Sequence, residues 1–327
     1  MTATRHNLPN ERLHFQHGPM DIVIGATGQS EAVARAHAAA WVRFEPLLEE
    51  LLAERQMLWQ PIGCGTCNPC FGKTARLMWD ACAPFAANFI TPMAAVAGAV
   101  AQTLAKRYES PGIEKAWINN GGDVAIVLSE GASVGVGVVS DLLAATKQIA
   151  VQGNPSVKWD ASLSIRYGEN SRGVATSGWG GRSFSLGIAD SVTVLARTAA
   201  MADAAATVIA NAVNVHDERI VRKPANQLKD NSDLGEMLVT VDVPALPQQL
   251  VGAAIEAGRL RAEQLLAQGL IDSAFICVQG MSVFVSACSS TSVLVANGYD
   301  VTQRAILPSE TTVAAMKPRK LAMECTA

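Results

Sequence analysis

The strand-forming segments of this chain come in pairs that are joined by short turns containing glycine. In "KAWINNGGDVAIVLSEGASVGVGVV", residues 115–139, runs rich in β-branched residues alternate with such turns. A short turn joins antiparallel neighbours, whereas parallel strands need a long crossover. The pattern therefore predicts hairpins rather than a doubly wound parallel sheet. Further strands are expected at 20–28, 161–167, 172–176, 190–196, 274–278 and 282–287.

Helical segments lie between these strands without a regular alternation. We expect helices at 30–55, from about 73 to 83, at 91–108, 199–214 and 247–268. Alanine and valine supply most of the apolar residues and aromatics only 5%, which favours tight packing of helices on sheets. The sequence thus predicts an α+β fold. With no linker-like change in composition, we expect one domain at 18–300, a flexible N-terminal arm at 1–17 and a peripheral segment at 301–327.

The overall charge argues against several classes of partner. A net charge of −3 without a lysine or arginine cluster predicts no binding to nucleic acid. The longest apolar stretches are interrupted by polar residues or proline, so no membrane span is expected. The polar first residues do not resemble a signal peptide, and a cytoplasmic protein is expected. Its seven cysteines are then thiols or metal ligands rather than disulfides.

One alanine-rich helix has a polar stripe. In "ADAAATVIANAV", residues 202–213, Asp203, Thr207 and Asn211 follow one another at intervals of four and so share a face. A buried carboxylate is costly unless it is paired or holds a metal, and carboxylate and hydroxyl oxygens suit Mg²⁺. The alternative is that Asp203 interacts with the helix start while Thr207 bonds back to its own helix.

Two glycine-containing segments are candidates for binding an anion. In "NNGGDVAI", residues 119–126, adjacent glycines allow backbone N–H groups to approach a phosphate or carboxylate; the alternative is a tight hairpin turn. In "GVATSGWGGRSF", residues 173–184, hydroxyls, glycines and one arginine form a plausible anion cradle; the alternative is a surface loop.

A third segment concentrates cysteine. The loop "GCGTCNPCFGK" contains Cys64, Cys67 and Cys70, and Cys82 follows twelve residues later. Four thiolates can bind Zn²⁺ or an iron–sulfur cluster. The alternatives are free thiols in a loop or a nucleophilic or redox cysteine.

Taken in order, "NNGGDVAI", "VATSG" and "DSVTVLARTAAMADAAAT" resemble the ApbE-like superfamily, flavin transferases that move FMN from FAD onto a protein threonine. The segment "TPMAAVAGAVA" at 91–101 is similar to an uncharacterised bacterial and archaeal branch of that superfamily, and the resemblance spans about 11–285. It implies a T-fold-like α+β architecture, mixed or antiparallel sheets packed with helices, and a ligand cleft between two related halves.

The resemblance also implies roles for individual residues. Asp203 and Thr207 match an aspartate and a threonine that bind Mg²⁺ beside the FAD pyrophosphate. The residues matching the cofactor cleft are Asn120, Gly121, Gly122, Asp123, Thr176, Ser177 and Gly178. The transferases also have a histidine in a segment after the "TSG" strand, where this chain reads "GGRSFSLGIADSV". Arg182, which can stabilise phosphate charge, and Asp190, a base if it faces the cleft, are the catalytic candidates there.

The sequence thus predicts an Mg²⁺-dependent enzyme of transferase or hydrolase type that binds an anionic small molecule such as FAD or another nucleotide. A non-catalytic binding protein, an FMN transferase and a pyrophosphate hydrolase are the alternatives. A homodimer is compatible with the sequence.

Overall fold

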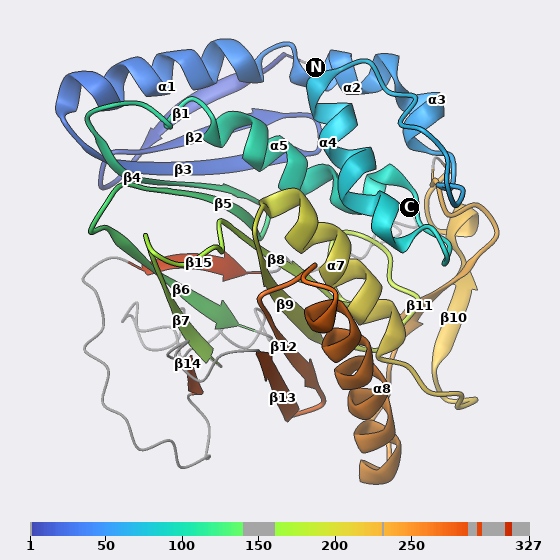
Figure 1. Ribbon diagram of the computed structural model, residues 1–327. Helices are drawn as coiled ribbons and strands as arrows, with labels where there is room; N and C mark the ends of the chain where they lie inside the picture. The colour runs from blue at the N-terminus through green and yellow to red at the C-terminus, as the bar shows by residue number, and fades with distance from the viewer. Residues whose placement is uncertain (1, 140–160, 231, 287–292, 296–310, 316–327) are drawn as a thin grey trace, which may run out of the picture.

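In the computed structural model, which describes residues 2–139, 161–230, 232–286, 293–295 and 311–315, a nine-stranded sheet runs through the centre (Figure 1). Its order is β1-β2-β3-β4-β5-β8-β9-β12-β13, and every neighbouring pair is antiparallel. The prediction of hairpins is therefore confirmed. The strands are β1 (Thr4–Leu8), β2 (Arg12–His17), β3 (Met20–Gly28), β4 (Ile113–Asn120), β5 (Asp123–Leu128), β8 (Gly173–Ser177), β9 (Ser191–Ala196), β12 (Ser273–Val278) and β13 (Met281–Ser286).

Helices cover one face of this sheet (Figure 1). Helix α1 packs on β3, α5 on β4 and β5, α7 on β8 and β9, and α8 on β12 and β13. Helix α4 packs on α5 and α7. The helical elements are α1 (Ser30–Phe44), α2 (Leu47–Ala53), α3 (Arg55–Leu58), α4 (Lys73–Cys82), η1 (Ala83–Phe85), η2 (Pro92–Ala95), α5 (Val96–Ala105), α7 (Ala199–Ala212), η3 (Ala225–Gln227) and α8 (Gln248–Ala267).

The opposite face of the sheet packs against a second, four-stranded sheet of order β14-β7-β6-β15. Its strands are β6 (Ser133–Val139), β7 (Ala161–Arg166), β14 (Val293–Val295) and β15 (Thr311–Ala315). Apolar residues of β5, such as Ile126, meet Val136 of β6 and Leu163 of β7 in a buried cluster. A pair of strands, β10 (Val221–Pro224) and β11 (Leu238–Asp242), forms a separate antiparallel sheet. The predicted α+β class, with mixed or antiparallel sheets packed with helices, is confirmed: the nine-stranded sheet is antiparallel, and the four-stranded sheet is mixed because β15 is parallel to β6.

Two expectations are corrected. The arm predicted at 1–17 contains β1 and β2, and β2 pairs with β3 because alternate residues of "RLHFQH" point inward. Phe15 is fully buried and packs against Trp41 and Phe44 of α1. The helix predicted at 30–55 is divided, since α1 ends before Pro46 and separate helices follow. Apart from β15, the segment 301–327 lies outside the described residues, and the single-domain boundary at 18–300 stays a prediction.

Candidate functional site

Two aspartates, the buried Asp123 and the half-buried Asp203, lie within reach of each other's charge where β5, α5 and α7 meet; we call them the acid pair. Gly98 N–H, in the first turn of α5, donates to Oδ2 of Asp203 at 2.9 Å. Burial, followed by the charge of Asp123, raises the pKa of Asp203 well above its ordinary value. Burial also raises the pKa of Asp123 to about 7, against the lowering effect of a hydrogen bond from Thr176 N–H. The site is therefore short of positive charge.

Arg182 supplies positive charge to both members of the acid pair. Its charge lowers the pKa of Asp123 and that of Asp203. The guanidinium lies against the β4–β5 turn, with Nη2 3.4 Å from the carbonyl oxygen of Asn120 and Nη1 3.3 Å from that of Pro19. A Cβ at Gly121 would lie 1.5 Å from Nη2, so this close approach requires glycine. The Arg182 side chain itself is exposed.

The two glycines form the hairpin turn that was the alternative to an anion loop. Asn120 pairs with Asp123 across the turn, and φ is +68° at Gly121 and +121° at Gly122. Positive φ favours glycine. Gly122 N–H donates to the side chain of Asn119 at 2.8 Å, and Nδ2 of buried Asn120 donates to the carbonyl of Ala97 at 3.1 Å. The turn is thereby fixed to the start of α5, and ligand contact at these glycines stays a prediction.

The strand end at 176–178 borders the acid pair through its backbone. Thr176 N–H donates to Oδ1 of Asp123 at 3.1 Å, while its hydroxyl bonds that of Thr193 at 2.8 Å. At Gly178, a Cβ would lie 2.3 Å from the backbone oxygen of Asp190, so this glycine permits two backbones to approach closely. Ser177 is half-buried between them. The structure thus brings this segment to the acid pair, and cofactor contact at Thr176, Ser177 and Gly178 stays a prediction.

Asp190 holds in place the loop that contains Arg182, residues 178–190, which we call the arginine loop. Trp179 Nε1 donates to Oδ1 of Asp190 at 3.2 Å, and the backbone N–H of Gln279 donates to Oδ2 at 2.5 Å. Both oxygens are therefore engaged within the protein. This is a positioning role, and a role for Asp190 as a base stays a prediction.

The polar stripe of α7 faces two different neighbours. Near the N-terminus of α7, Asp203 accepts the hydrogen bond from the backbone N–H of Gly98 in α5. At its other end Oδ1 of Asn211 accepts Leu186 N–H at 2.9 Å, and Nδ2 of Asn214 donates to the carbonyl of Leu186 at 3.0 Å. Half-buried Thr207 lies between them, one turn after Asp203. The stripe thus connects the acid pair with the arginine loop.

The four cysteines expected to bind a metal cluster lie in different surroundings. Cys64 and Cys67 are exposed, whereas Cys70 and Cys82 are buried. Burial and the charges of Glu54 and Asp80 raise the pKa of Cys70 to about 11, whereas Cys82 lies near Asp203 and Asp233. Within the part of the chain that the structure describes, no three or more histidine, cysteine, aspartate or glutamate side chains are grouped to hold a metal. The four thiols are thus not gathered at one point in this structure, and metal binding by these cysteines stays a prediction.

A carboxylate closes this loop in place of a metal. Buried Glu54 accepts the backbone N–H groups of Phe71 and Gly72, each at 2.7 Å, just before α4 begins.

We expect iodoacetamide to label Cys64 and Cys67 within minutes and to label Cys70 and Cys82 only after unfolding, since burial raises the pKa of both inner thiols. Peptide mass spectrometry measures each site. Protection of Cys64 and Cys67 that EDTA removes would instead support a metal centre.

Other residues at this site were not identified from the sequence. Thr91 donates to Oδ2 of Asp233 at 2.5 Å, joining the loop before β11 to the segment that leads into α5. The charges of Asp233 and Asp203 both raise the pKa of Cys82, so the two carboxylates flank the same buried thiol. In the sequence, Asp233 lies in the polar segment "KDNSDLGE". The spacing of its residues does not indicate that Asp233 contacts Thr91.

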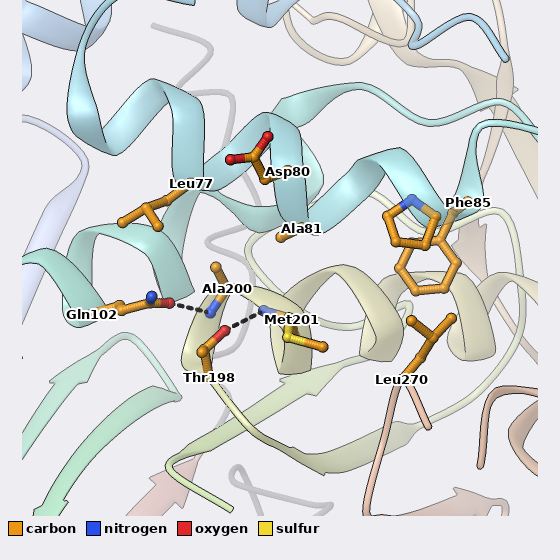
Figure 2. Close-up of a pocket in the computed structure, with 10 residues that line it drawn as sticks. Leu77, Asp80, Ala81, Phe85, Gln102, Thr198, Ala200, Met201 and Leu270 are labelled. Carbon is orange, nitrogen blue, oxygen red and sulfur yellow. Dashed lines mark hydrogen bonds between the residues drawn. The ribbon is translucent and has the colours of Figure 1, made fainter. Parts of the chain in front are cut away.

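An apolar cavity of about 220 Å³ lies beside the first turn of α7 (Figure 2). Two polar residues that line it are already engaged, because Gln102 accepts Ala200 N–H and Thr198 accepts Met201 N–H, each at 3.3 Å. Neither member of the acid pair lines this cavity. Its other lining residues are Leu77, Asp80, Ala81, Pro84, Phe85, Ala200, Met201 and Leu270.

Fold and site together define an α+β protein whose antiparallel sheet carries an acidic, arginine-covered site at the start of a helix. The chain belongs to the family described as "AbpE bacteria", whose model matches residues 5–284. This confirms the predicted ApbE-like membership.

Several relatives are UPF0280 proteins of archaea. One from Methanopyrus kandleri is 34% identical over 204 residues, which are 59% of this chain and 73% of that protein. Another, from Methanothermobacter thermautotrophicus, is 38% identical over 131 residues, which are 39% of this chain and 45% of that protein. A crystal structure of Pseudomonas stutzeri flavinyl transferase ApbE in its apo form is 12% identical, with a TM-score of 0.38, and the match covers 88% of this chain and 95% of that one. In the described part of the chain, no helix combines the length and apolar character needed to span a membrane.

Proposed function

We propose that this protein is a Mg²⁺-dependent enzyme that binds a nucleotide-like or flavin-like anion at the acid pair. The observation that carries the proposal is that the buried Asp123 and the half-buried Asp203 lie within reach of each other's charge, with the pKa of both carboxyls raised. Two buried carboxylates are costly unless a cation neutralises them. Mg²⁺ typically takes one or two carboxylates and leaves its other positions to water and phosphate oxygens. A cytoplasmic location and a homodimer are further parts of the proposal.

The donor set fits such an ion. Asp203 accepts backbone N–H groups of Gly98, at Oδ2, and of Ala97, and Asp123 accepts Thr176 N–H at Oδ1. Carboxylate oxygens can accept more than one partner, so both side chains retain lone pairs for a cation. The hydroxyl of Thr207 follows on the same face of α7. These three side chains would hold Mg²⁺, which when bound supplies a Lewis acid for a phosphoryl group. Arg182 stays cationic and so can stabilise phosphate charge, but it cannot accept a proton.

The reaction class is transferase or hydrolase, and a non-catalytic binding protein is the second candidate. The engagement of both Asp190 oxygens by Trp179 and Gln279 favours that second candidate, because it leaves the arginine loop without an available base. Transfer of FMN to a threonine needs a group to accept the hydroxyl proton, and such a base contributes about 10²–10⁴-fold to the rate.

We therefore predict that the purified protein, given FAD, Mg²⁺ and a flavin-acceptor protein, leaves the acceptor unmodified. Flavin fluorescence on the acceptor band of a denaturing gel measures the outcome. An ApbE transferase under the same conditions is the positive control. Fluorescence that rises faster than in the no-enzyme sample would contradict this prediction and favour the plain transferase alternative.

The ligand itself is best identified without choosing a candidate. We expect protein purified in Mg²⁺ and then denatured to release a phosphate-containing small molecule, identified by mass spectrometry, with about one Mg²⁺ per chain by metal analysis. The Asp203→Asn protein should release neither. A ligand without phosphate, or equal release from the variant, would contradict the proposed function.

A further inference from the structure

The cavity beside the first turn of α7 is separate from the acid pair. It lies between α4 and η1 on one side and α7 on the other, with Gln102 of α5 at one end and Leu270 at the other (Figure 2). Its volume is about 220 Å³, and seven of its ten lining residues are apolar. Because neither Asp123 nor Asp203 lines it, a ligand in this cavity is distinct from one at the acid pair.

The walls and the volume of the cavity suit a single apolar ring. Leu77 of α4, Phe85 of η1 and Met201 of α7 line it with large apolar side chains. An apolar cavity of about 150 Å³ takes up benzene. At about 220 Å³ the present cavity has room for one such ring with a short substituent. The apolar surface that the ring and the walls remove from water favours binding.

The start of α7 offers little to an anion, although helix N-termini often bind one. The N–H of Ala200 donates to Oε1 of Gln102, and that of Met201 to the hydroxyl of Thr198, each at 3.3 Å. The N–H of Ala202 donates to the carbonyl of Thr198 at 3.0 Å. These first-turn donors are therefore already satisfied within the protein.

The charged residue among those that line the cavity is Asp80. Its side chain is exposed, and Oδ1 accepts Nδ2 of Asn68 at 2.8 Å. Asn68 is itself fixed, because its side chain also accepts the N–H of Cys70 at 2.9 Å. Among the residues that the structure describes, no lysine, arginine or histidine forms an ion pair with Asp80. Its negative charge is thus available to a cation from solution.

We propose that this cavity binds a small primary amine, whose ring or short alkyl chain lies between α4 and α7 and whose ammonium group meets Asp80. The inference does not rest on the proposed function. The apolar walls select the body of the ligand, and Asp80 favours a positive head group over a negative one. No bond is made or broken at this site. For so small a ligand, binding of roughly millimolar strength is expected.

Three ligands with one ring and different charges test this in the full-length protein: benzylamine, benzyl alcohol and benzoate at pH 7. With methyl-¹³C methionine in the protein, benzylamine should shift the signal of Met201, which Met201→Leu identifies. The signal of buried Met20 on β3 should stay in place. Benzyl alcohol should bind roughly two- to fivefold more weakly, since an exposed ion pair contributes little. Benzoate should not bind at concentrations of benzylamine that saturate the site.

Substitutions place the ligand within the cavity. Ala81→Leu puts further carbons into the space and should weaken benzylamine binding at least about tenfold. Ala39→Leu, at an exposed position of α1, is the matched control and should leave the affinity unchanged. Asp80→Asn should lower the affinity for benzylamine to that for benzyl alcohol, whose own binding should not change. Thermal unfolding verifies that each variant is folded, and Leu77→Phe is the second cavity-filling variant if Ala81→Leu does not fold.

The proposal is overturned by any of three results: a Met201 signal that does not move, equal binding of the three ligands, or unchanged benzylamine affinity in the cavity-filling variant. Asp203→Asn and EDTA should both leave benzylamine binding unchanged, because the acid pair does not line the cavity. Failure of the metal site and failure of the amine site are therefore distinguishable. A shift of Met201 that Ala81→Leu abolishes and that follows the charge of the ligand supports the amine site.

Discussion

Without metal at pH 8, Asp123→Asn is expected to be more stable than the wild-type protein. Burial raises the pKa of Asp123 from 3.8 to about 7, so between these values the folded state holds a proton that the unfolded state has lost. Wild-type stability should therefore fall as the pH rises from about 4 to 7 and stay low above that. Asparagine keeps an acceptor for Thr176 N–H but has no charge, and the gain should be about 2 kcal/mol or more at pH 8.

Urea unfolding of EDTA-treated protein at pH 5 and pH 8 measures this difference, which should be small at pH 5. Asp80→Asn, at an exposed aspartate, is the control and should show no such dependence on pH. Saturating Mg²⁺ should reverse the order of stability, since an ion present at 100 times its Kd stabilises the wild type by about 2.7 kcal/mol. A variant that is less stable than wild type at pH 8 without metal would show that burial of charge is not the dominant effect.

Gly98→Ala is expected to destabilise the protein by about 3 kcal/mol, at the upper end of the usual cost of overpacking. A Cβ at this position would lie 2.2 Å from the backbone oxygen of Ala199, and the backbone cannot move aside as a flexible side chain would. Helices α5 and α7 would have to separate. The hydrogen bond from Gly98 N–H to Asp203 depends on the same approach, so metal binding should weaken as well.

Gly252→Ala is the matched control, because Gly252 also lies within a helix but has nothing within 4 Å of its added Cβ. Alanine there should stabilise the protein by about 0.5–1 kcal/mol through its better helix propensity. Chemical unfolding gives both values. Equal effects of the two substitutions would mean that the α5–α7 crossing does not constrain the fold in the way described.

The parts of the fold that sequence predicts well are those set by local pattern. The turn at Gly121 and Gly122 and the periodicity of α7 are local features, and both appear where expected. The N-terminal strands were misjudged because their polar residues hid the alternation of Leu13, Phe15 and His17. That alternation has meaning only once β3 and α1 are present to bury it.

In the candidate site, too, the sequence predicts the local features but not the contacts between distant segments. The spacing of Asp203 and Thr207 places them on one face of a helix, but it does not reveal that Gly98 of α5 would occupy one oxygen of Asp203. The cysteine spacing predicted a cluster, but it does not reveal that Glu54 accepts the backbone N–H groups of Phe71 and Gly72 at the end of the loop. Arg182 was identified as an anion partner, but its place against the β4–β5 turn depends on a loop that Asp190 and Asn211 anchor.

The most direct test of the acid pair as a Mg²⁺-dependent anion site is the binding of FAD, followed by flavin fluorescence, to wild-type and Asp203→Asn protein with and without Mg²⁺. We expect the wild type to bind FAD at least about tenfold more tightly with Mg²⁺ than with EDTA, because the ion would join phosphate to carboxylate. Asp203→Asn should bind weakly in both conditions. Binding by the wild type that is equally tight in EDTA, or Mg²⁺-dependent binding that survives in Asp203→Asn, would contradict the assignment.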